Sequence, residues 1–596
     1  MVLWCYNMGS TPVARKGADM AYFLKKSRNK KGLYLQIYES HWERERGHTA
    51  QTSVRALGYE HELRESGIAD PIAHFKAEVD AMNAERRASR AAAKERRIGD
   101  STPELYLGHF PLKAVNEALG VAEDLAFLQL AGGFRFSLHG LLSDLACARA
   151  VSPCSKLRTY TEVLPQLAGA DASYSLDQLY DGVAFLGSEH RKVVEIYNAR
   201  VAGLFGRDTS TTYFDCTNFF FEVDLERGLK RKGPSKERRK DPIVGMGLLL
   251  DAECIPLGLA IYPGNESEKP VMREVIAQVK RRNSMEGRTV RVADKGLNCA
   301  DNIADALLAG DGYIFSKSVK QLGELELAWA LSEDGWEDVT GEGGELRYRL
   351  KSCVADFDYK VTAESGRKRK VRLEEKRVVT YNPKLARKQR AEIDRQVEKA
   401  RGLRLSQAKR SEYGDCAKFV TFAAVDANGE EPDAAVVATL NHAAIERARR
   451  LAGYNVIVTS EKSMPDQEVY STYHELWRIE ETFRAMKSQL DARPVFMQKD
   501  ESIAGHFLVC YISVLLERLV QVKVLGKRFS TEDVMGLARG FRAVEVSERK
   551  YVNISKASPL IDELERMTGL PLGNYHLKKS EVKAIAECRF DLPAAR

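Results

Sequence analysis

The sequence lacks the patterns that mark a membrane protein, a secreted protein or a zinc protein. No window reaches the roughly eighteen uninterrupted apolar residues of a membrane span, and the most apolar one, residues 506–520, contains Glu517 and Arg518. The ten cysteines are scattered, with no CxxC pair and no histidine at zinc spacing. The first twenty residues lack the charged start and apolar core of a secretory signal. We therefore expect a cytoplasmic protein with reduced thiols and no membrane partner, with residues 506–520 as a core helix.

Three common catalytic motifs are also missing. The chain contains no GxxxxGK[ST] phosphate loop, no HExxH and no GxSxG. A P-loop nucleotide hydrolase, a zinc peptidase of the HExxH type and a hydrolase with a nucleophile elbow are therefore excluded. The length of 596 residues predicts several domains, roughly three to five.

Positive charge is present in clusters, although the net charge is only +7. The clusters are residues 85–97, residues 367–377 and the set Lys230, Arg231, Lys232, Lys236, Arg238, Arg239 and Lys240. Solvated loops and helix faces would explain any one of them. Several together favour a polyanionic partner such as nucleic acid, because each lysine or arginine that meets a phosphate releases condensed counterions.

The hydrophobic pattern changes along the chain and predicts an α/β fold. We expect a mixed sheet with flanking helices, interrupted by a β-rich insertion and preceded by a helical domain. The predicted segments are a strand and helix unit at 1–100, a helical domain suited to DNA binding at 101–206, the first part of the sheet core at 207–321, the inserted β-rich and basic helical subdomain at 322–448, the second part of the core at 449–530, and a helical C-terminal region at 531–596. No clean helix-turn-helix pattern marks residues 101–206.

The stretch YHELWRIEETFRAMK, residues 473–487, predicts one amphipathic helix. Spacings of three and four place Tyr473, Trp477, Glu480, Arg484 and Lys487 on one face. Ile479, Phe483, Met486 and Leu490 form the adjoining apolar stripe. An acid between cations and aromatic rings suits a site that binds a metal ion and phosphates, although an amphipathic helix whose charges face water has the same pattern.

Three carboxylates stand out as a possible metal site: Asp215 within an expected strand, Asp294 at the end of the strand VRVAD, and Glu480 on the helix. Magnesium takes oxygen ligands and is held by a few carboxylates together with phosphate oxygens of the substrate. Two such ions can activate a water or a 3′-hydroxyl and stabilise the leaving oxygen of a phosphodiester. The rivals are Glu481 for the third acid, and Asp251 and Asp224 for the first; each acid taken alone is more often structural.

These segments resemble the cut-and-paste DDE transposases of bacterial insertion sequences. The helix is similar to their Y-(2)-R-(3)-E-(6)-K signature, with Tyr473, Glu480 and Lys487 at its spacings. TYFDCTNFFFE resembles their first-aspartate strand, VADKGL their second, and GLAIYPGNESEKP the stretch between the two. The resemblance covers residues 210–516. One position departs, because Leu476 stands where the signature has arginine.

The resemblance implies a ribonuclease-H-like fold with Asp215, Asp294 and Glu480 as catalytic metal ligands. It implies two Mg²⁺ ions per site, for which Mn²⁺ would substitute, and cleavage and strand transfer at terminal inverted repeats. The partners would be double-stranded DNA at the element ends and target DNA, bound by a synaptic homodimer on the bacterial nucleoid. The expected DNA contacts are Tyr473, Arg478, Arg484 and Lys487 near the scissile phosphate, and Lys230, Arg231, Lys232, Arg238 and Arg239 elsewhere on the backbone.

Two other functions remain open at this point. A nuclease of the same fold that cuts without strand transfer would need the same ions and residues. A non-catalytic DNA-binding relic would keep the basic clusters and bind DNA without its carboxylates.

Overall fold

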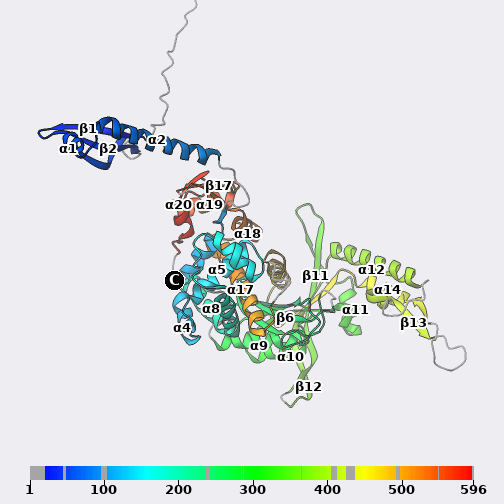
Figure 1. Cartoon of the computed structure of the whole chain (residues 1–596). Helices are drawn as coiled ribbons and strands as arrows, with labels where there is room; N and C mark the ends of the chain where they lie inside the picture. Colours follow the sequence, from blue (N-terminus) through cyan, green and yellow to red (C-terminus); the bar gives the residue numbers. More distant parts are fainter. Residues whose placement is uncertain are drawn as a thin grey trace, which may run out of the picture. The chain divides into compact units, whose positions relative to one another are not determined.

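The computed structural model describes residues 21–43, 48–95, 104–236, 240–282, 285, 287–363, 365–404, 413–424, 436–490, 497–547 and 549–592. The chain forms two compact units (Figure 1). One comprises Met1–Pro103 with Glu545–Glu548, and the other comprises Glu104–Val544 with Arg549–Arg596. Arg238 and Arg239, two of the expected DNA contacts, lie outside the described residues.

The N-terminal unit is a three-stranded antiparallel sheet, in the order β1-β2-β3, packed against one long helix. Its elements are β1 (Tyr22–Asn29), β2 (Gly32–Glu43), β3 (His48–Tyr59), α1 (Glu60–Glu65) and α2 (Pro71–Glu95). Leu35 and Ile37 of β2 are buried, as are Phe75 and Val79 of α2. The strand from Gly32 and the charged helix that follows it, both expected from the alternation of apolar residues, are confirmed.

The larger unit is built on a mixed sheet whose central strands have the ribonuclease-H order. Those strands are β5 (Thr211–Phe220), β6 (Ile243–Leu250), β7 (Pro256–Pro263), β8 (Val290–Ala293) and β9 (Gly312–Lys317). β5, β6 and β7 are antiparallel neighbours, β8 is parallel to β5, and β9 is parallel to β8. The spatial order β7-β6-β5-β8-β9 therefore confirms the predicted ribonuclease-H-like sheet.

Four further strands extend this sheet beyond β9, and only one of them, β15, lies in the segment 449–530 that was predicted as part of the core. They are β15 (Tyr454–Thr459), β12 (Lys368–Tyr381), β11 (Leu346–Thr362) and β10 (Glu337–Thr340). β11 and β12 form a long hairpin (Figure 1). Much of the expected insertion, residues 322–448, therefore belongs to the core sheet, because β12 pairs with β15 over six residues.

The remainder of residues 322–448 makes a small helical subdomain with its own apolar clusters. Its elements are α12 (Pro383–Arg404), the 3₁₀ helix η4 (Gly414–Phe419), β13 (Val420–Ala424), β14 (Val436–Leu440) and α14 (His442–Arg450). β13 and β14 pair as the expected hairpin, whose turn at Asn428-Gly429 lies outside the described residues. The helix α11 (Glu324–Leu331) and the 3₁₀ turn η3 (Val319–Gln321) connect β9 to β10.

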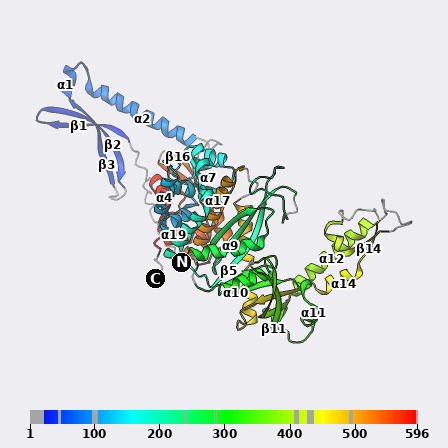
Figure 2. The same ribbon diagram turned by 90° about the horizontal axis from the view of Figure 1, so that it is seen from below.

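Helices cover both faces of the central strands. Phe214 and Cys216 of β5 belong to a cluster with α9 (Glu268–Arg281) and α10 (Ala300–Leu308), and α9 runs alongside β5 in Figure 2. Tyr213 and Phe219, on the opposite face of β5, belong to a second cluster with α17 (Asp500–Leu519), which the π-helical turn η6 (Val520–Val524) continues. Among the described residues one helix, Asp500–Val524, is long and apolar enough to cross a membrane, and it is fully buried in the protein. The core helix predicted at 506–520 is thus confirmed.

The helices of residues 101–206 share this second cluster and do not form a unit of their own. They are α3 (Phe110–Ala118), α4 (Ala122–Ala131), α5 (Leu138–Val151), α6 (Lys156–Arg158), the turns η1 (Thr159–Val163) and η2 (Leu164–Gln166), α7 (Leu176–Ser188) and α8 (His190–Phe205). α7 crosses α17 at two glycines: a Cβ on Gly505 would lie 2.0 Å from the carbonyl oxygen of Val183. Only glycine permits so close an approach of the two helix backbones. The crossing therefore fixes α7 against the core helix α17.

The C-terminal residues contain a sheet as well as the expected helices. The sheet has the order β18-β17-β16-β4, and the strand β4 (Glu104–Tyr106) pairs with Arg542–Val544. The other elements are α18 (Thr531–Gly540), β16 (Arg542–Ser547), β17 (Lys550–Asn553), α19 (Pro559–Thr568), β18 (His576–Lys578) and α20 (Lys579–Ala586). The strands of this region have six, four and three residues, too few for a sequence pattern to reveal them, which explains why a purely helical region was predicted.

Candidate active site

Parallel pairing of β5 and β8 places two aspartates side by side. Tyr213 is opposite Val292 and Phe214 is opposite Ala293. Asp215 and Asp294 each follow the last of these pairs by one residue, so they lie on adjacent strands about 4.8 Å apart. Both side chains alternate onto the face of Tyr213 and Val292, which packs against α17. The fold therefore brings together two acids that are far apart in the sequence.

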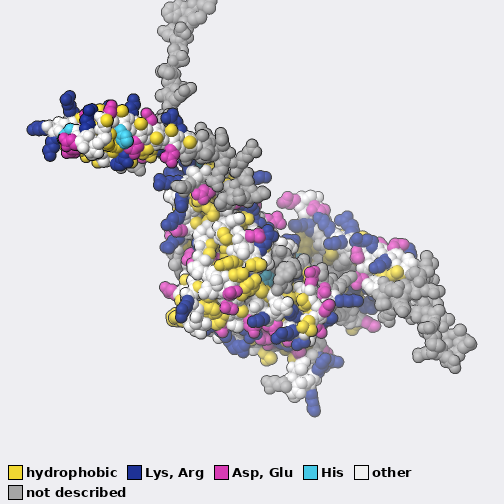
Figure 3. Space-filling view, in the orientation of Figure 1, with side chains coloured by type: hydrophobic (Ala, Val, Ile, Leu, Met, Phe, Trp, Pro, Cys, Tyr) yellow, Lys and Arg dark blue, Asp and Glu magenta, His cyan; other side chains and the backbone are white. Residues whose placement is uncertain are grey.

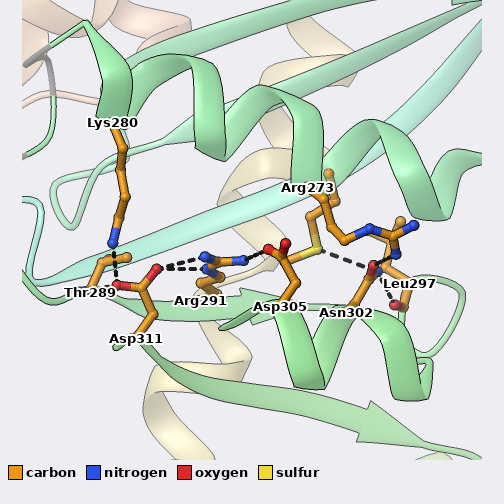
Figure 4. A network of polar contacts seen from close by, with 9 residues as sticks. Arg273, Lys280, Thr289, Arg291, Leu297, Asn302, Asp305 and Asp311 are labelled. Carbon is orange, nitrogen blue, oxygen red and sulfur yellow. Dashed lines mark hydrogen bonds and ion pairs between the residues drawn. The ribbon is translucent and has the colours of Figure 1, made fainter. Parts of the chain in front are cut away.

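A buried ionic network fixes β8 three residues before Asp294 (Figure 4). Arg291 donates from Nε and Nη2 to Asp311 Oδ2, at 2.9 and 2.7 Å, and from Nη1 to Asp305 Oδ2 at 2.6 Å. Lys280 of α9 also binds Asp311. Next to this network, Asn302 donates to the carbonyl of Leu297 at 2.7 Å and so holds the turn that follows Asp294.

Asp215 lies in a mixed electrostatic environment. Its Oδ1 accepts a hydrogen bond from the backbone N–H of Cys216 at 2.7 Å, and Lys236 Nζ lies 3.9 Å from the same oxygen. Lys236 also lies 3.5 Å from Glu268. Burial raises the pKa of Asp215 to about 6, with further increases from Glu268 and Asp294, while Lys236 lowers it. A carboxyl with neighbouring acids and partial burial gains from a bound cation.

The segment that carries Glu480 is not the single helix that was predicted. It consists of α15 (Asp466–His474), two turn residues, α16 (Trp477–Arg484) and a π-helical turn η5 (Ala485–Gln489). Leu476 N bonds to Tyr473 O, three residues back, which tightens the chain at the joint. The predicted apolar stripe is confirmed, because Ile479, Phe483, Met486 and Leu490 are all buried.

The three acids line one cavity of about 860 Å³. Asp215 and Asp294 lie in its wall with Tyr473 and Glu480. Tyr473 Oη donates to Asp294 Oδ1 at 3.3 Å. Burial raises the pKa of Tyr473, and the charges of Asp294 and Glu480 add to that increase. The hydroxyl therefore remains a donor to Asp294 at neutral pH.

The rival acids are engaged elsewhere or exposed. Glu481 accepts a hydrogen bond from Arg518 at 3.0 Å. Asp251 is buried, paired with Arg207 at 2.9 Å, and accepts from the backbone of Ile255. Asp224 is exposed, and none of the three lines the cavity.

The sequence profile of the transposase DDE domain family matches residues 219–516, half of the chain. The protein belongs to this transposase family. The match includes Asp294 and Glu480 and begins just after Asp215. No curated protein matches this transposase. One solved structure that it matches is a piggyBac transposase synaptic complex with hairpin DNA, at 9% identity over 73% of this chain and 79% of that one. The TM-score of 0.33 is too low to carry a structural argument.

Transposases of this family generally use divalent metal ions, and the donor set here suits one only in part. Asp215 and Asp294 are adjacent oxygen donors of the kind that magnesium prefers. In the described part of the chain, however, no three His, Cys, Asp or Glu side chains lie close enough to one point to hold an ion. Asp215 and Asp294 lie on neighbouring strands and Glu480 lines the same cavity, but the three carboxylates do not converge on one point.

The cations expected to contact DNA occupy different positions around the transposase site. Arg484 is exposed, and Arg478 pairs with Glu475 and lies over the ring of Trp477. Lys487 lies 5.3 Å from the ring centroid of Phe219 on β5. Leu476, at the signature's arginine position, is buried and lines the cavity.

The basic segment after β5 is only partly on the surface. Lys230 is buried and lies over the ring of Phe221. Arg231 donates to the carbonyl of Gly228 at 3.1 Å, whereas Lys232 is exposed. Of these three, Lys232 alone presents its charge fully to solvent.

Sequence reasoning missed Lys236 and Glu268 as site residues. In the sequence Lys236 is one of several clustered cations, and Glu268 belongs to PGNESE, a segment that resembles the family. The repeated acids of PGNESE were the available sign that this segment contributes to the site. Only the pairing of β5 with β6 and β7 brings Glu268 near Asp215.

Proposed function

We propose that this transposase cleaves DNA at the terminal inverted repeats of an insertion sequence and joins the freed 3′ ends to target DNA. Asp215, Asp294 and Glu480 are the proposed catalytic metal ligands, for two Mg²⁺ ions that Mn²⁺ can replace. The observation that carries this proposal is the parallel register of β5 and β8, which sets Asp215 beside Asp294 in the cavity that Glu480 also lines.

Two divalent ions, when bound, would activate a water or a 3′-hydroxyl and stabilise the leaving oxygen of the phosphodiester. The chain's own residues orient the ligands for this role. The Tyr473 hydroxyl holds Asp294 Oδ1, and the N–H of Cys216 holds Asp215 Oδ1. Lys236, close to both Asp215 and Glu268, offsets part of the carboxylate repulsion.

Glu480 joins the aspartate pair, in this proposal, by rotation of α16 about its joint with α15. The two turn residues Glu475 and Leu476 interrupt the helix directly after His474. The hydrogen bond from Glu480 N to Leu476 O is long, at 3.4 Å, which is typical of a loosely held first turn. The closed arrangement would be favoured only with divalent cations bound, because their positive charge offsets the repulsion among three carboxylates and the DNA phosphates.

DNA phosphates near the scissile bond are the proposed partners of Tyr473, Arg478, Arg484 and Lys487. Arg231, Lys232, Arg238 and Arg239 add backbone contacts, and the buried Lys230 joins them only if the segment after β5 rearranges. A homodimer would hold the two element ends and the target duplex together, on the nucleoid in the cytoplasm. Contacts of this kind position the strand without reading its sequence.

A cleavage assay with a matched pair of glutamates tests the proposal. The substrate is a duplex that carries the inverted repeats flanking the gene, incubated with Mg²⁺ or with EDTA. We expect wild-type protein and Glu481→Gln to cut and Glu480→Gln to lose cutting by about a thousandfold. Thermal unfolding of both variants checks that Glu481→Gln, which touches Arg518, stays folded. Cutting by Glu480→Gln at the wild-type rate rejects Glu480 as the third ligand.

The same assay separates the two alternative functions. A pre-cut element end with a free 3′-hydroxyl and a target plasmid report strand transfer directly. Cleavage without joined product indicates a nuclease of the same fold. Binding without cleavage at any divalent ion concentration indicates a non-catalytic relic.

A further inference from the structure

The N-terminal sheet has two chemically different faces. Ile37 is opposite Arg55, which pairs with Glu78 of α2, so the face of Leu35 and Ile37 is the one that α2 covers. The alternate residues point to the other face: Phe23, Lys25, Ser27, Tyr34, Gln36, Tyr38, Ser53 and Tyr59. α1 lies beside the β1–β2 turn, near Arg28 and Gly32. α1 reaches the end of this second face, where the ring centroid of His61 lies 5.7 Å from that of Tyr59, while α2 lies on the first face.

This second face, which we call the open face, consists of aromatic rings and hydrogen-bonding side chains. Phe23 and Tyr38 have ring centroids 5.9 Å apart, and Tyr34 and Tyr59 have centroids 4.9 Å apart. Lys25 Nζ lies 4.3 Å from the centroid of the Tyr38 ring. The four rings are only partly buried. Neighbouring rings in contact across three strands make a stiff surface that presents both apolar area and hydroxyl groups.

Charge is distributed unequally around this sheet. Residues 25–31 contain five cations, Lys25, Lys26, Arg28, Lys30 and Lys31, and the first acid along the chain after them is Glu39. Glu39 lies on the covered face, where it pairs with Arg86 at 2.9 Å, and Glu78 pairs there with Arg55. None of the strand residues of the open face is an acid, and the nearest acids, Glu60 and Glu62 of α1, lie beside its end at Tyr59. Figure 3 shows lysine and arginine side chains at the tip of this unit.

We propose that the open face and the β1–β2 turn form a second DNA-binding site that grips duplex DNA in its major groove. A two-stranded ribbon fits the major groove, which is about 12 Å wide. Lys30 and Lys31 in the turn, with Lys25 on the strand, then meet phosphates on the groove walls. Gln36 and the tyrosine hydroxyls face the base edges, where side-chain donors and acceptors discriminate between sequences.

The helix behind the sheet keeps this surface rigid. Asn83 of α2 accepts from the backbone N–H of Tyr22 at 2.9 Å and donates to its carbonyl at 2.8 Å. Arg86 lies over the ring of Tyr22, and Arg55 lies over the ring of Phe75. The sheet therefore reaches DNA with its side chains already ordered, which lowers the entropic cost of binding.

This proposal moves DNA recognition away from residues 101–206, where the sequence had placed it. The apolar faces of those helices pack against α17, and α7 and α17 are in backbone contact at Gly187 and Gly505. The identity of the bound duplex as an element end rests on the proposed function. Duplex binding by this face does not.

Anisotropy of fluorescein-labelled DNA with the full chain in EDTA tests the site without catalysis. The probes are a short duplex from the DNA flanking the gene and its single strand. Lys25→Glu and Gln36→Glu place a negative charge on the open face, and Lys76→Glu, at an exposed position of α2, makes the same charge change as Lys25→Glu. We expect each open-face variant to weaken duplex binding about tenfold and to flatten its salt dependence, with Lys76→Glu changing it less than about twofold.

Two results overturn the proposal: equal weakening by Lys76→Glu and Lys25→Glu, or tighter binding of the single strand than of the duplex by the wild-type protein. Circular dichroism of each variant confirms that the unit is folded. The inference and the proposed function fail separately. Loss of duplex binding in Lys25→Glu supports the inference even if the wild-type protein never cuts DNA, and cutting without that loss supports only the function.

Discussion

The nine-stranded sheet and the N-terminal three-stranded sheet of this transposase differ in how much of each is covered. The central strands of the nine-stranded sheet have α9 and α10 on one face and α17 on the other, whereas the three-stranded sheet has α2 on one face. A sheet covered on both sides can offer a substrate only the ends of its strands. Asp294 directly follows the end of β8, and Asp215 lies on β5 just beyond the last residue that pairs with β8. A sheet covered on one side can offer a whole face, as Tyr34, Gln36 and Tyr38 do.

Charges follow the same difference. In the covered sheet Arg291 and Asp311 form an ion pair whose side chains are 3% and 0% exposed. In the N-terminal unit the pair of Arg55 and Glu78 is 50% and 34% exposed. The first pair is therefore structural, because neither charge can return to water when its partner is lost. The second pair is solvated and contributes little.

The largest expected effect is the loss of cleavage in Asp215→Asn. Removing one ligand of the aspartate pair should lower the cleavage rate by about a thousandfold or more, equivalent to about 4 kcal/mol in the activation barrier. Duplex affinity in EDTA should stay within about twofold of wild type, because Asp215 lies outside the open face. Parallel rate and anisotropy measurements on one preparation check both. If duplex affinity fell as much as the cleavage rate, the active site and the DNA-binding surface would not be separate sites.

Asp311→Asn should produce the next largest effect, on stability. The substitution leaves the buried Arg291 without its main partner and should lower the free energy of unfolding by about 3 to 4 kcal/mol. Urea denaturation followed by tryptophan fluorescence measures the change. Retained stability would mean that Asp305, which also binds Arg291, suffices alone to hold β8.

A buried acid on α17 makes the catalytic unit sensitive to pH. Glu517 is buried, and in the described structure neither of its carboxylate oxygens has a hydrogen-bond partner. Burial raises its pKa from an ordinary value of 4.5 to about 8, against the lowering effect of Arg518 and Arg539. Between these two values the folded state binds more protons than the unfolded state, so the free energy of unfolding falls as pH rises, by about 3 kcal/mol at pH 7.

Glu517→Gln should remove this pH dependence and stabilise the protein at pH 7. Urea midpoints at pH 5 and pH 7.5 measure the slope in the variant and in wild type. Hydrogen exchange of peptides from α2 provides a control, because the N-terminal unit should not respond to the substitution. An unchanged slope in the variant would assign the pH dependence to other groups.

Glu78→Gln should have the smallest effect. Its pair with Arg55 is largely solvated, so the N-terminal unit should lose only about 0.5 kcal/mol or less. Hydrogen exchange in β2 and α2 reports this local stability. A loss comparable to that of Asp311→Asn would show that the two units hold their charges in the same way.

Sequence patterns identified the core strands and the long core helix because their signals are local. The β-rich run TYFDCTNFFFE and the largely apolar run at 506–520 arise from burial, which acts residue by residue. The same logic predicted the apolar stripe of residues 479–490 correctly. It failed at the joint between α15 and α16, because a break of two residues leaves the spacing of the neighbouring apolar residues almost unchanged.

Pairing between distant strands could not be inferred in the same way. The extension of the sheet through β12 and β15, and the small sheet of β4 with β16, join segments whose own patterns are too short or too polar to specify a partner. The orientation of α16 also determined which glutamate lines the cavity. Glu480 and Glu481 are indistinguishable by composition, and the rotation of α16 alone sends one to the cavity and the other to Arg518.

The sequence by itself determined the types of element, the candidate acids and the resemblance to DDE transposases, since these depend on residue identity and local spacing. Only the tertiary structure decided that Asp215 adjoins Asp294, that the helices of 101–206 belong to the catalytic core, and that one face of the N-terminal sheet carries rings and cations without acids. The physical reason is that chemistry at a site depends on distances across the fold, and those distances are set by strand register and helix packing.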